Sequence, residues 1–226
     1  MAFELKNVVP WGRNLEEYTK MFALSEMDLQ QKVISFGDGP ASFNAEMTAQ
    51  QHSVISLDPV YQFSREEIQR RIAETKEVVI TQTRKNKANF VWKHIKDVDE
   101  LARIRMEAMQ SFLSDFEAGK QEGRYITHTL PERTHFADLS FDIGLSSHFL
   151  ILYDQLGLDF HLQSITEMLR LCRELRIFPL LNLNAEKSDV LDGIINHFAP
   201  EYTLDIVQVD YEFQKNGNEM LRIKRK

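Results

Sequence analysis

The sequence predicts an α/β protein in which helices cover a single, mostly parallel β-sheet. Short apolar runs with strand character alternate with helical patterns over most of the 226 residues, which is typical of parallel strands joined by crossover helices. The last two strand-like runs are joined by QKNGN, whose Asn-Gly pair indicates an antiparallel hairpin. The length suits one domain, residues 1–226, rather than two domains with separate cores.

Seven strand-like runs set the order of the predicted elements. The runs are residues 33–36, 52–57, 124–130, 140–153, 176–183, 203–213 and 219–225. Ahead of the first run, Leu15 and Tyr18 recur at helical spacing within a predicted N-terminal helical cap, residues 1–29. After the second run, Ser64 and Glu67 form a capping box that predicts the start of a helix.

A helical insertion is predicted at residues 82–123, after the second strand unit. Asp97 can cap a long helix there and Gly119 can end it. Farther along, a helix is expected over residues 161–175, and Ser188 is expected to start another. The insertion interrupts an otherwise regular alternation of strands and helices.

The composition narrows the class of protein. Hydrophobic residues make up 43% and charged residues 27% of the chain, as in ordinary folded domains, and the net charge of −7 argues against a nucleic acid partner. The single cysteine, Cys172, excludes an intramolecular disulfide and fits a reducing compartment. No apolar run reaches the ~18 residues typical of a membrane span, and residues 1–15 lack a signal-peptide pattern. We therefore expect a cytoplasmic protein with no membrane partner.

A glycine-rich turn after the first strand and an acid after the second predict a nucleoside site. Gly37-Asp38-Gly39 ends the first run, and glycine lets a ligand approach the backbone because it has no Cβ. Asp58 lies 19 residues after Gly39, where a carboxylate can accept hydrogen bonds from both ribose hydroxyls. The alternative is an ordinary turn, since these residue types are common in turns. A nicotinamide dinucleotide site is disfavoured because Ser42 stands where its fingerprint has a third glycine or alanine.

Four segments in order, GDGPASF, VISLDP, HFADLSFDIGLSSHFL and LRLCRELRIFPLL, resemble class I S-adenosylmethionine-dependent methyltransferases over about residues 30–226. The resemblance implies an α/β, Rossmann-like, seven-stranded mixed sheet flanked by helices, with a C-terminal antiparallel hairpin and S-adenosylmethionine as cofactor. It implies contacts of the glycine loop with the methionine part, of Asp58 with the ribose, and of the segment after the third strand with the adenine. The cofactor-binding residues implied are Phe36, Gly37, Asp38, Gly39, Pro40, Asp58, Pro59, Leu130, Ser146 and Ser147.

The sequence departs from the family pattern at the methionine end. The acid usual two residues before the first glycine is Ser35 here, and the usual third glycine is Ala41. The resemblance therefore implies a binding site in which the methionine end is held differently.

His148 is the candidate catalytic residue. It follows the fourth strand-like run, at the sheet edge where open α/β sheets bind ligands, and can act as a general base or orient the acceptor. The alternative is a packed histidine bonded to backbone. Asp154, Asp159 and His161 lack a fourth ligand, so no metal site is predicted.

The function expected is methyl transfer to a small-molecule acceptor, which the sequence does not identify, and a homodimer is an open alternative to a monomer. Two other functions stay open. One is a nicotinamide-dependent oxidoreductase, and the other is a non-catalytic S-adenosylmethionine-binding protein that uses residues 82–123 for protein contact.

Overall fold

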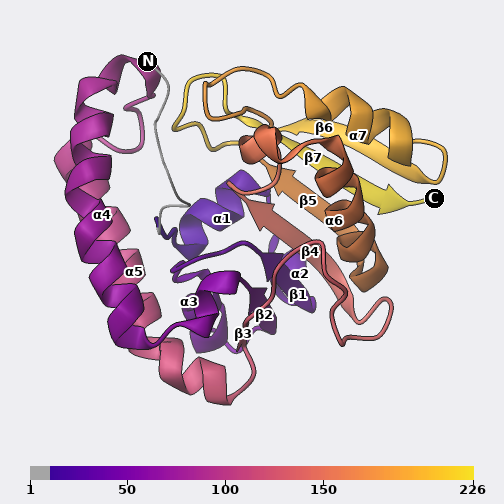
Figure 1. Cartoon of the computed structure of the whole chain (residues 1–226), viewed down its shortest axis with the longest axis horizontal. Coiled ribbons are helices and arrows are strands. Elements are labelled where there is room, and N and C mark those ends of the chain that lie inside the picture. The colour runs from indigo at the N-terminus through magenta and orange to yellow at the C-terminus, as the bar shows by residue number, and fades with distance from the viewer. Residues whose placement is uncertain (1–10) are drawn as a thin grey trace.

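The computed structural model describes residues 11–226, which form a seven-stranded sheet in the order β3-β2-β1-β4-β5-β7-β6 (Figure 1). The strands are β1 (Val33–Phe36), β2 (Val54–Leu57), β3 (Tyr125–Ile126), β4 (Phe141–Ser147), β5 (Cys172–Phe178), β6 (Tyr202–Gln208) and β7 (Glu219–Arg225). β1 to β5 pair in parallel, whereas β7 runs antiparallel to both β5 and β6. The predicted mixed sheet of seven strands is confirmed.

Helices cover both faces of this sheet. They are α1 (Leu15–Met21), α2 (Glu26–Leu29), α3 (Phe43–Ala49), α4 (Arg65–Lys85), α5 (Val98–Gln121), α6 (Leu158–Leu171) and α7 (Val190–Phe198), with 3₁₀ turns η1 (Pro59–Gln62), η2 (Lys87–Asn89) and η3 (Ile151–Leu156). α6 and α7 bury their apolar faces on one side of the sheet, and α1 and α3 pack on the other. Burial on both faces explains why β1 is apolar almost throughout.

β1 occupies the position that creates a ligand cleft. It pairs with β2 on one side and with β4 on the other, so the chain crosses in opposite directions from β1. Loops that leave the carboxyl ends of such a pair diverge, and open α/β sheets bind ligands at this switch point.

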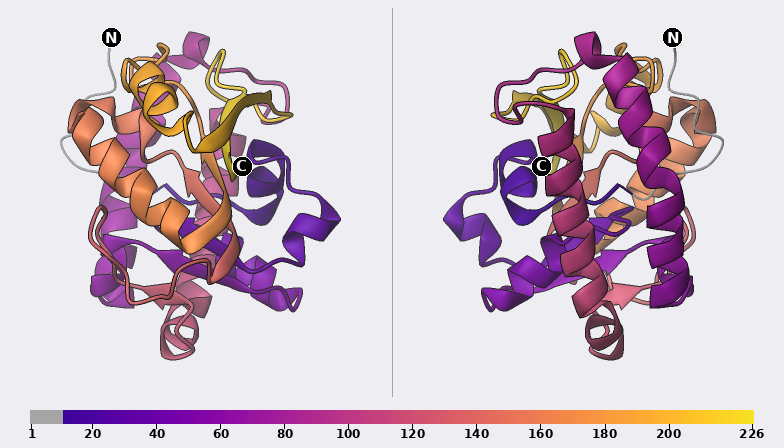
Figure 2. Two further views of the ribbon diagram at one scale, coloured as in Figure 1. Left: turned by 90° about the vertical axis from the view of Figure 1, so that its right-hand side faces the viewer. Right: turned by 90° about the vertical axis from the view of Figure 1, so that its left-hand side faces the viewer.

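The helices α4 and α5 form a pair at the β3 end of the sheet (Figure 2). The predicted caps are confirmed, because Ser64 and Glu67 make a reciprocal capping box and Asp97 accepts from two backbone N–H groups of α5. The pair shares a core with η1 and β3 in which aromatic side chains dominate. The segment proposed as an insertion, residues 82–123, thus starts in the last turns of α4 and ends just before β3.

Several predicted boundaries were wrong. The helix expected over residues 161–175 spans Leu158–Leu171, and Cys172 begins β5 because it pairs with Phe141 of β4, so tertiary pairing overrides the helical spacing. Gly119 does not end α5. It lies inside the helix, where a Cβ would come within 2.5 Å of the Tyr125 ring, and the chain turns instead at Gly123, whose φ is +76°.

The C-terminal hairpin is antiparallel as predicted, but its turn is wider than the Asn-Gly pair suggests. β6 ends at Gln208, and residues 209–218 cross toward the tip of the α4–α5 pair. There, the backbone N–H of Val91 donates to the Phe213 carbonyl at 2.7 Å, and that of Lys215 donates to the Asn89 carbonyl at 3.0 Å. These bonds draw the loop away from a tight reversal.

The N-terminal cap predicted for residues 1–29 includes α1 and α2, and its first ten residues lie outside the described part of the chain. Across residues 11–226, no helix combines the length and the hydrophobicity that crossing a bilayer requires.

Candidate functional site

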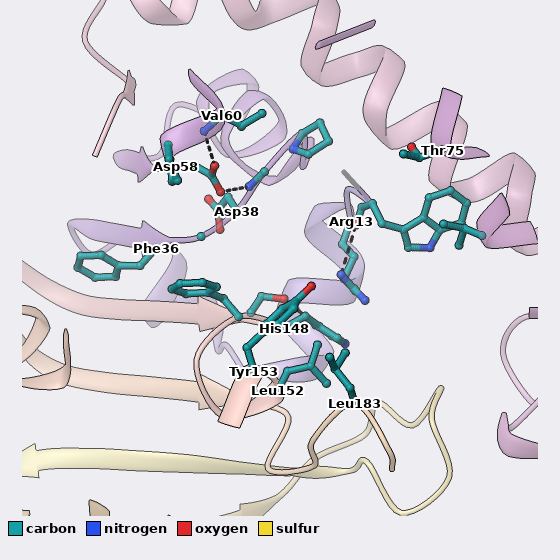
Figure 3. Close-up of a pocket in the computed structure, with 18 of the residues that line it drawn as sticks. Arg13, Phe36, Asp38, Asp58, Val60, Thr75, His148, Leu152, Tyr153 and Leu183 are labelled. Atoms are coloured by element: carbon teal, nitrogen blue, oxygen red, sulfur yellow. Dashed lines mark hydrogen bonds between the residues drawn. The ribbon is translucent and has the colours of Figure 1, made fainter. Parts of the chain in front are cut away.

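A cavity of about 1220 Å³ lies at the carboxyl ends of β1, β2 and β4, with α4 on its far side (Figure 3). All but one of the residues predicted to bind the cofactor or to act in catalysis line it. They are Phe36, Gly37, Asp38, Gly39, Pro40, Asp58, Pro59, Leu130, Ser147 and His148. Ser146 is fully buried in β4 and does not line the cavity.

The glycine loop and Asp58 are held together at the tips of β1 and β2. The Gly39 N–H donates to Asp58 Oδ2 at 2.7 Å, and the Val60 N–H donates to Oδ1 at 2.7 Å, as the dashed lines in Figure 3 mark. Gly37 and Gly39 have φ of +72° and +55°, the left-handed region that glycine tolerates best. The two predicted contact points are therefore direct neighbours.

The two glycines differ in what they face. A Cβ on Gly39 would meet no atom within 4 Å, so its backbone is open to a ligand, whereas a Cβ on Gly37 would lie 2.9 Å from Cβ of Phe149. Phe149 also lines the cavity. The open side of the glycine loop is thus at Gly39, beside the carboxylate.

Asp58 keeps acceptor capacity for a ligand. Each carboxylate oxygen receives one backbone N–H, which leaves further lone pairs on both. Burial raises the pKa of Asp58 to about 6, against the lowering effect of the two backbone hydrogen bonds. A group that titrates near pH 6 in a cleft is typical of a functional site.

The Asp38 carboxylate holds the glycine loop in place through hydrogen bonds within the protein. Its carboxylate accepts hydrogen bonds from Tyr18 Oη at 2.6 Å, from Ser56 Oγ at 2.7 Å and from Ser35 Oγ. Burial raises the pKa of this carboxyl, and no cation pairs with it among the described residues. Ser35 therefore anchors an acid three residues later in the chain, Asp38.

His148 lies at the tip of β4 in a constrained conformation. Its φ is +52°, its N–H donates to the Phe178 carbonyl at 2.7 Å, and its Nδ1 is 2.9 Å from Ser147 Oγ. Burial lowers the pKa of His148 well below its ordinary value, and the positive charges of Arg13 and Arg105 lower it further. The imidazole is therefore neutral near pH 7, with one ring nitrogen as a donor and the other as an acceptor.

Arg13 and His128 are two of several charged or polar residues of the cavity that were missed from the sequence. Arg13 reaches it from the segment before α1, and His128 reaches it from the loop after β3, where its Nε2 is buried without a hydrogen-bond partner among residues 11–226. Neither stands in a motif. The one local signal for the position of Arg13 is Gly12, which lies so close to the Pro40 carbonyl that a Cβ would not fit.

Beside Arg13, a buried ion pair joins three distant segments. Arg105 of α5 donates to Glu17 of α1 and, at 3.2 Å, to Tyr211 Oη, and Tyr211 donates to Glu17 at 2.9 Å. Arg105 lines the cavity as well. Through Arg105, the ion pair forms part of the cavity wall.

Asp154 and His161 are hydrogen-bonded to other groups of the protein. Both ring nitrogens of His161 lie against backbone carbonyls, those of Gly157 and Leu150, and Asp154 accepts from Asn182. Within residues 11–226, no three His, Cys, Asp or Glu side chains gather as a set of metal ligands.

Comparison with solved structures finds similar chains at low identity. PH0226 protein of Pyrococcus horikoshii OT3 is 12% identical, with 93% of this chain and 91% of that chain covered and a TM-score of 0.48. A TehB-like SAM-dependent methyltransferase of Corynebacterium glutamicum is 15% identical, with 87% and 81% covered and a TM-score of 0.46. A SAM dependent methyltransferase of Aquifex aeolicus is 13% identical, with 93% and 88% covered and a TM-score of 0.40.

No family model matches the chain. In sequence, it is similar to the uncharacterized protein MJ0045 of Methanocaldococcus jannaschii, with 40% identity over 223 residues that cover 98% of each chain. The chain belongs to the family of this archaeal protein. Its sheet, with parallel strands and a C-terminal antiparallel hairpin, has the Rossmann-like architecture that the resemblance implies.

Proposed function

We propose that the protein is an S-adenosylmethionine-dependent methyltransferase that acts on a small molecule. The observation that carries the proposal is the contact between Gly39 and Asp58, which puts a bare backbone and a carboxylate side by side at one end of a large cavity. An adenosyl group needs this combination, since its ribose offers two hydroxyl donors and its chain must pass close to the backbone.

The residues present fit the cofactor. Asp58 would hold the ribose, the open face of Gly39 would accommodate the chain that leaves it, and His128 has a buried nitrogen free to bond the adenine side. Leu130 follows β3 and lines the cavity near His128. When bound, S-adenosylmethionine supplies an electrophilic methyl group on a positively charged sulfur.

The protein's own part in the reaction is positioning and proton removal. Correct alignment of reactants alone supplies up to ~7–11 kcal/mol in intramolecular reactions, so no protein nucleophile is required. His148 is neutral and lines the cavity at the tip of β4, so it can take a proton from an acceptor that enters protonated. Apolar side chains of η3 and of the following helix, Leu152 and Phe160 among them, limit water there.

Calorimetric titration with S-adenosylmethionine and its demethylated product, S-adenosylhomocysteine, tests the proposal. Asp58→Ala is expected to weaken binding by about tenfold or more, because a hydroxyl pair loses its charged acceptor. Asp205→Ala is the matched control, since Asp205 lies on β6 and pairs with Arg222 outside the cavity. Equal affinity in Asp58→Ala and Asp205→Ala would mean that Asp58 does not contact the ribose.

The same measurement addresses the alternatives. NAD should leave the melting temperature unchanged where S-adenosylmethionine raises it, and the reverse result would favour the oxidoreductase. A screen of metabolite extracts with a radiolabelled methyl donor then separates a catalyst from a protein that only binds the cofactor.

A further inference from the structure

Arg13 differs from every other arginine at low exposure in the described chain. Four arginine side chains that are at most 13% exposed each have a carboxylate partner: Arg105 with Glu17, Arg124 with Asp115, Arg170 with Glu167 and Arg176 with Glu174. Arg13 forms no ion pair within residues 11–226. Within the described part of the chain, its Nη1 donates to the Trp11 carbonyl alone, at 3.3 Å, and its Nε is buried without a partner.

The position of Arg13 is built into the glycine loop. Its carbonyl accepts the Ser42 N–H at 3.0 Å, and Gly12 packs so tightly that a Cβ would come within 2.0 Å of the Pro40 carbonyl oxygen. The backbone is therefore fixed, and the guanidinium extends into the cavity toward His148 (Figure 3). A planar, fixed guanidinium offers paired donors that suit a carboxylate or a phosphate.

Among residues 11–226, Arg13 has no carboxylate of its own to pair with. Glu17 forms an ion pair with Arg105 and none with Arg13, so this wall has two guanidinium groups but one carboxylate. Burial and the charge of Arg105 both lower the pKa of Arg13. Burial and then the charge of Arg13 lower the pKa of His148, whereas burial raises the pKa of Tyr153 and the charge of Arg13 offsets part of that rise. An anion bound here would relieve the burial of an unpaired charge.

We propose that Arg13 binds an anionic group, a carboxylate or a phosphate, on the small molecule that accepts the methyl group. This inference rests on the proposed function. Arg13 reaches toward His148 and Tyr153, on the β4 side of the cavity, whereas the ribose acceptor Asp58 lies at the tip of β2. Leu152 and Leu183 line the same end, so the acceptor would carry its anion on an apolar body.

The cofactor's own carboxylate is the other source of this chemistry, and binding measurements separate the two. S-adenosylhomocysteine and 5′-methylthioadenosine, which lacks the amino acid part, are titrated into wild type, Arg13→Gln and Arg71→Gln. Arg71 is the matched control, since it lines the same cavity from α4 but is exposed and stacks over the Phe63 ring. Benzoate, phenyl phosphate and neutral benzamide are then titrated into each complex with S-adenosylhomocysteine.

We expect Arg13→Gln to change the affinity for S-adenosylhomocysteine by less than about threefold. It should weaken the binding of both anions by about tenfold or more and leave the binding of benzamide unaffected. Arg71→Gln should bind all of these ligands as wild type does. Arg13→Lys should restore part of the anion binding. Loss of S-adenosylhomocysteine affinity with methylthioadenosine unchanged would assign Arg13 to the cofactor and overturn the proposal. Equal anion binding by wild type and Arg13→Gln, or none by either, would overturn it too.

A failure of the proposed function gives a different pattern. Wild type would then bind neither S-adenosylmethionine nor S-adenosylhomocysteine, while the two anions, titrated into the protein alone, would still distinguish wild type from Arg13→Gln.

Discussion

The two halves of the cavity are built on different principles. The strand-tip half, Gly37–Pro40 with Asp58–Val60, is held by bonds between residues 2 and 19 positions apart in the chain. The outer half contains Arg13, His148 and Arg105, and Arg105 is held in a buried cluster with Glu17 and Tyr211 by bonds between residues 88 to 194 positions apart. The strand-tip half therefore follows from local sequence and the outer half from the packing of distant segments.

Charge divides the same two halves. Among residues 11–226, Asp38 and Asp58 are buried between hydroxyl and N–H donors and pair with no cation, while the outer half holds two guanidinium groups and one carboxylate. An uncharged donor such as a ribose hydroxyl suits the first environment, and an anion suits the second. The contrast explains how one cavity can distinguish two ligands.

Breaking the ion pair of the outer half should have the largest effect. Glu17→Ala leaves Arg105, 1% exposed, as a buried charge without its carboxylate, and we expect the free energy of unfolding to fall by ~3–5 kcal/mol. Chemical denaturation measures it. Glu16→Ala is the control, since Glu16 is 73% exposed and pairs only with Lys20, and it should change stability by less than ~0.5 kcal/mol.

If Glu17→Ala were no less stable than Glu16→Ala, the outer half would not depend on its long-range ion pair. The distinction between the two halves would then rest on charge alone.

The pH dependence of binding sharpens the comparison on the strand-tip side. The pKa of Asp58 is raised to about 6 by burial, and hydroxyl donors of a ligand favour the ionised form. Affinity for S-adenosylhomocysteine should therefore be constant above about pH 7 and weaken by up to ~tenfold per unit as the pH falls below 6. Calorimetry between pH 5 and 8 measures this, with Asp58→Asn expected to show a flat profile.

The same shift has a consequence for stability with the opposite sign. Folded Asp58 takes up its proton at a higher pH than the unfolded chain does, so this residue's contribution to stability falls as the pH rises from about 4 to about 6. If the wild-type affinity for S-adenosylhomocysteine did not change between pH 5 and 8, Asp58 would not be a contact of the ligand.

The sequence predicted the strand-tip half well, because glycine, aspartate and the strand ends are local signals. Gly39 and Asp58 do meet, and the capping residues Ser64 and Asp97 begin the helices as expected. The position of Arg13 could not be predicted, because it depends on two long-range contacts. Gly12 packs on Pro40 and the Ser42 N–H donates to the Arg13 carbonyl, and no periodicity in the sequence connects these segments. Cys172 was placed in a helix because its spacing is helical, and only pairing with Phe141 shows that it starts a strand.

The smallest effect is expected where the α4–α5 pair meets the C-terminal loop. Phe90 stacks on Phe213 with ring centroids 4.8 Å apart, and backbone bonds from Val91 and Lys215 join the same two segments. Phe90→Leu keeps apolar bulk but loses the stacking, which is worth ~0.5–1.5 kcal/mol. We expect a loss of that size in the free energy of unfolding and an increase in hydrogen exchange at residues 86–97 and 209–218. Val78→Ala is the control, because Val78 is an exposed α4 residue. If hydrogen exchange at the two segments did not change in Phe90→Leu, the backbone bonds alone would join the α4–α5 pair to the C-terminal loop.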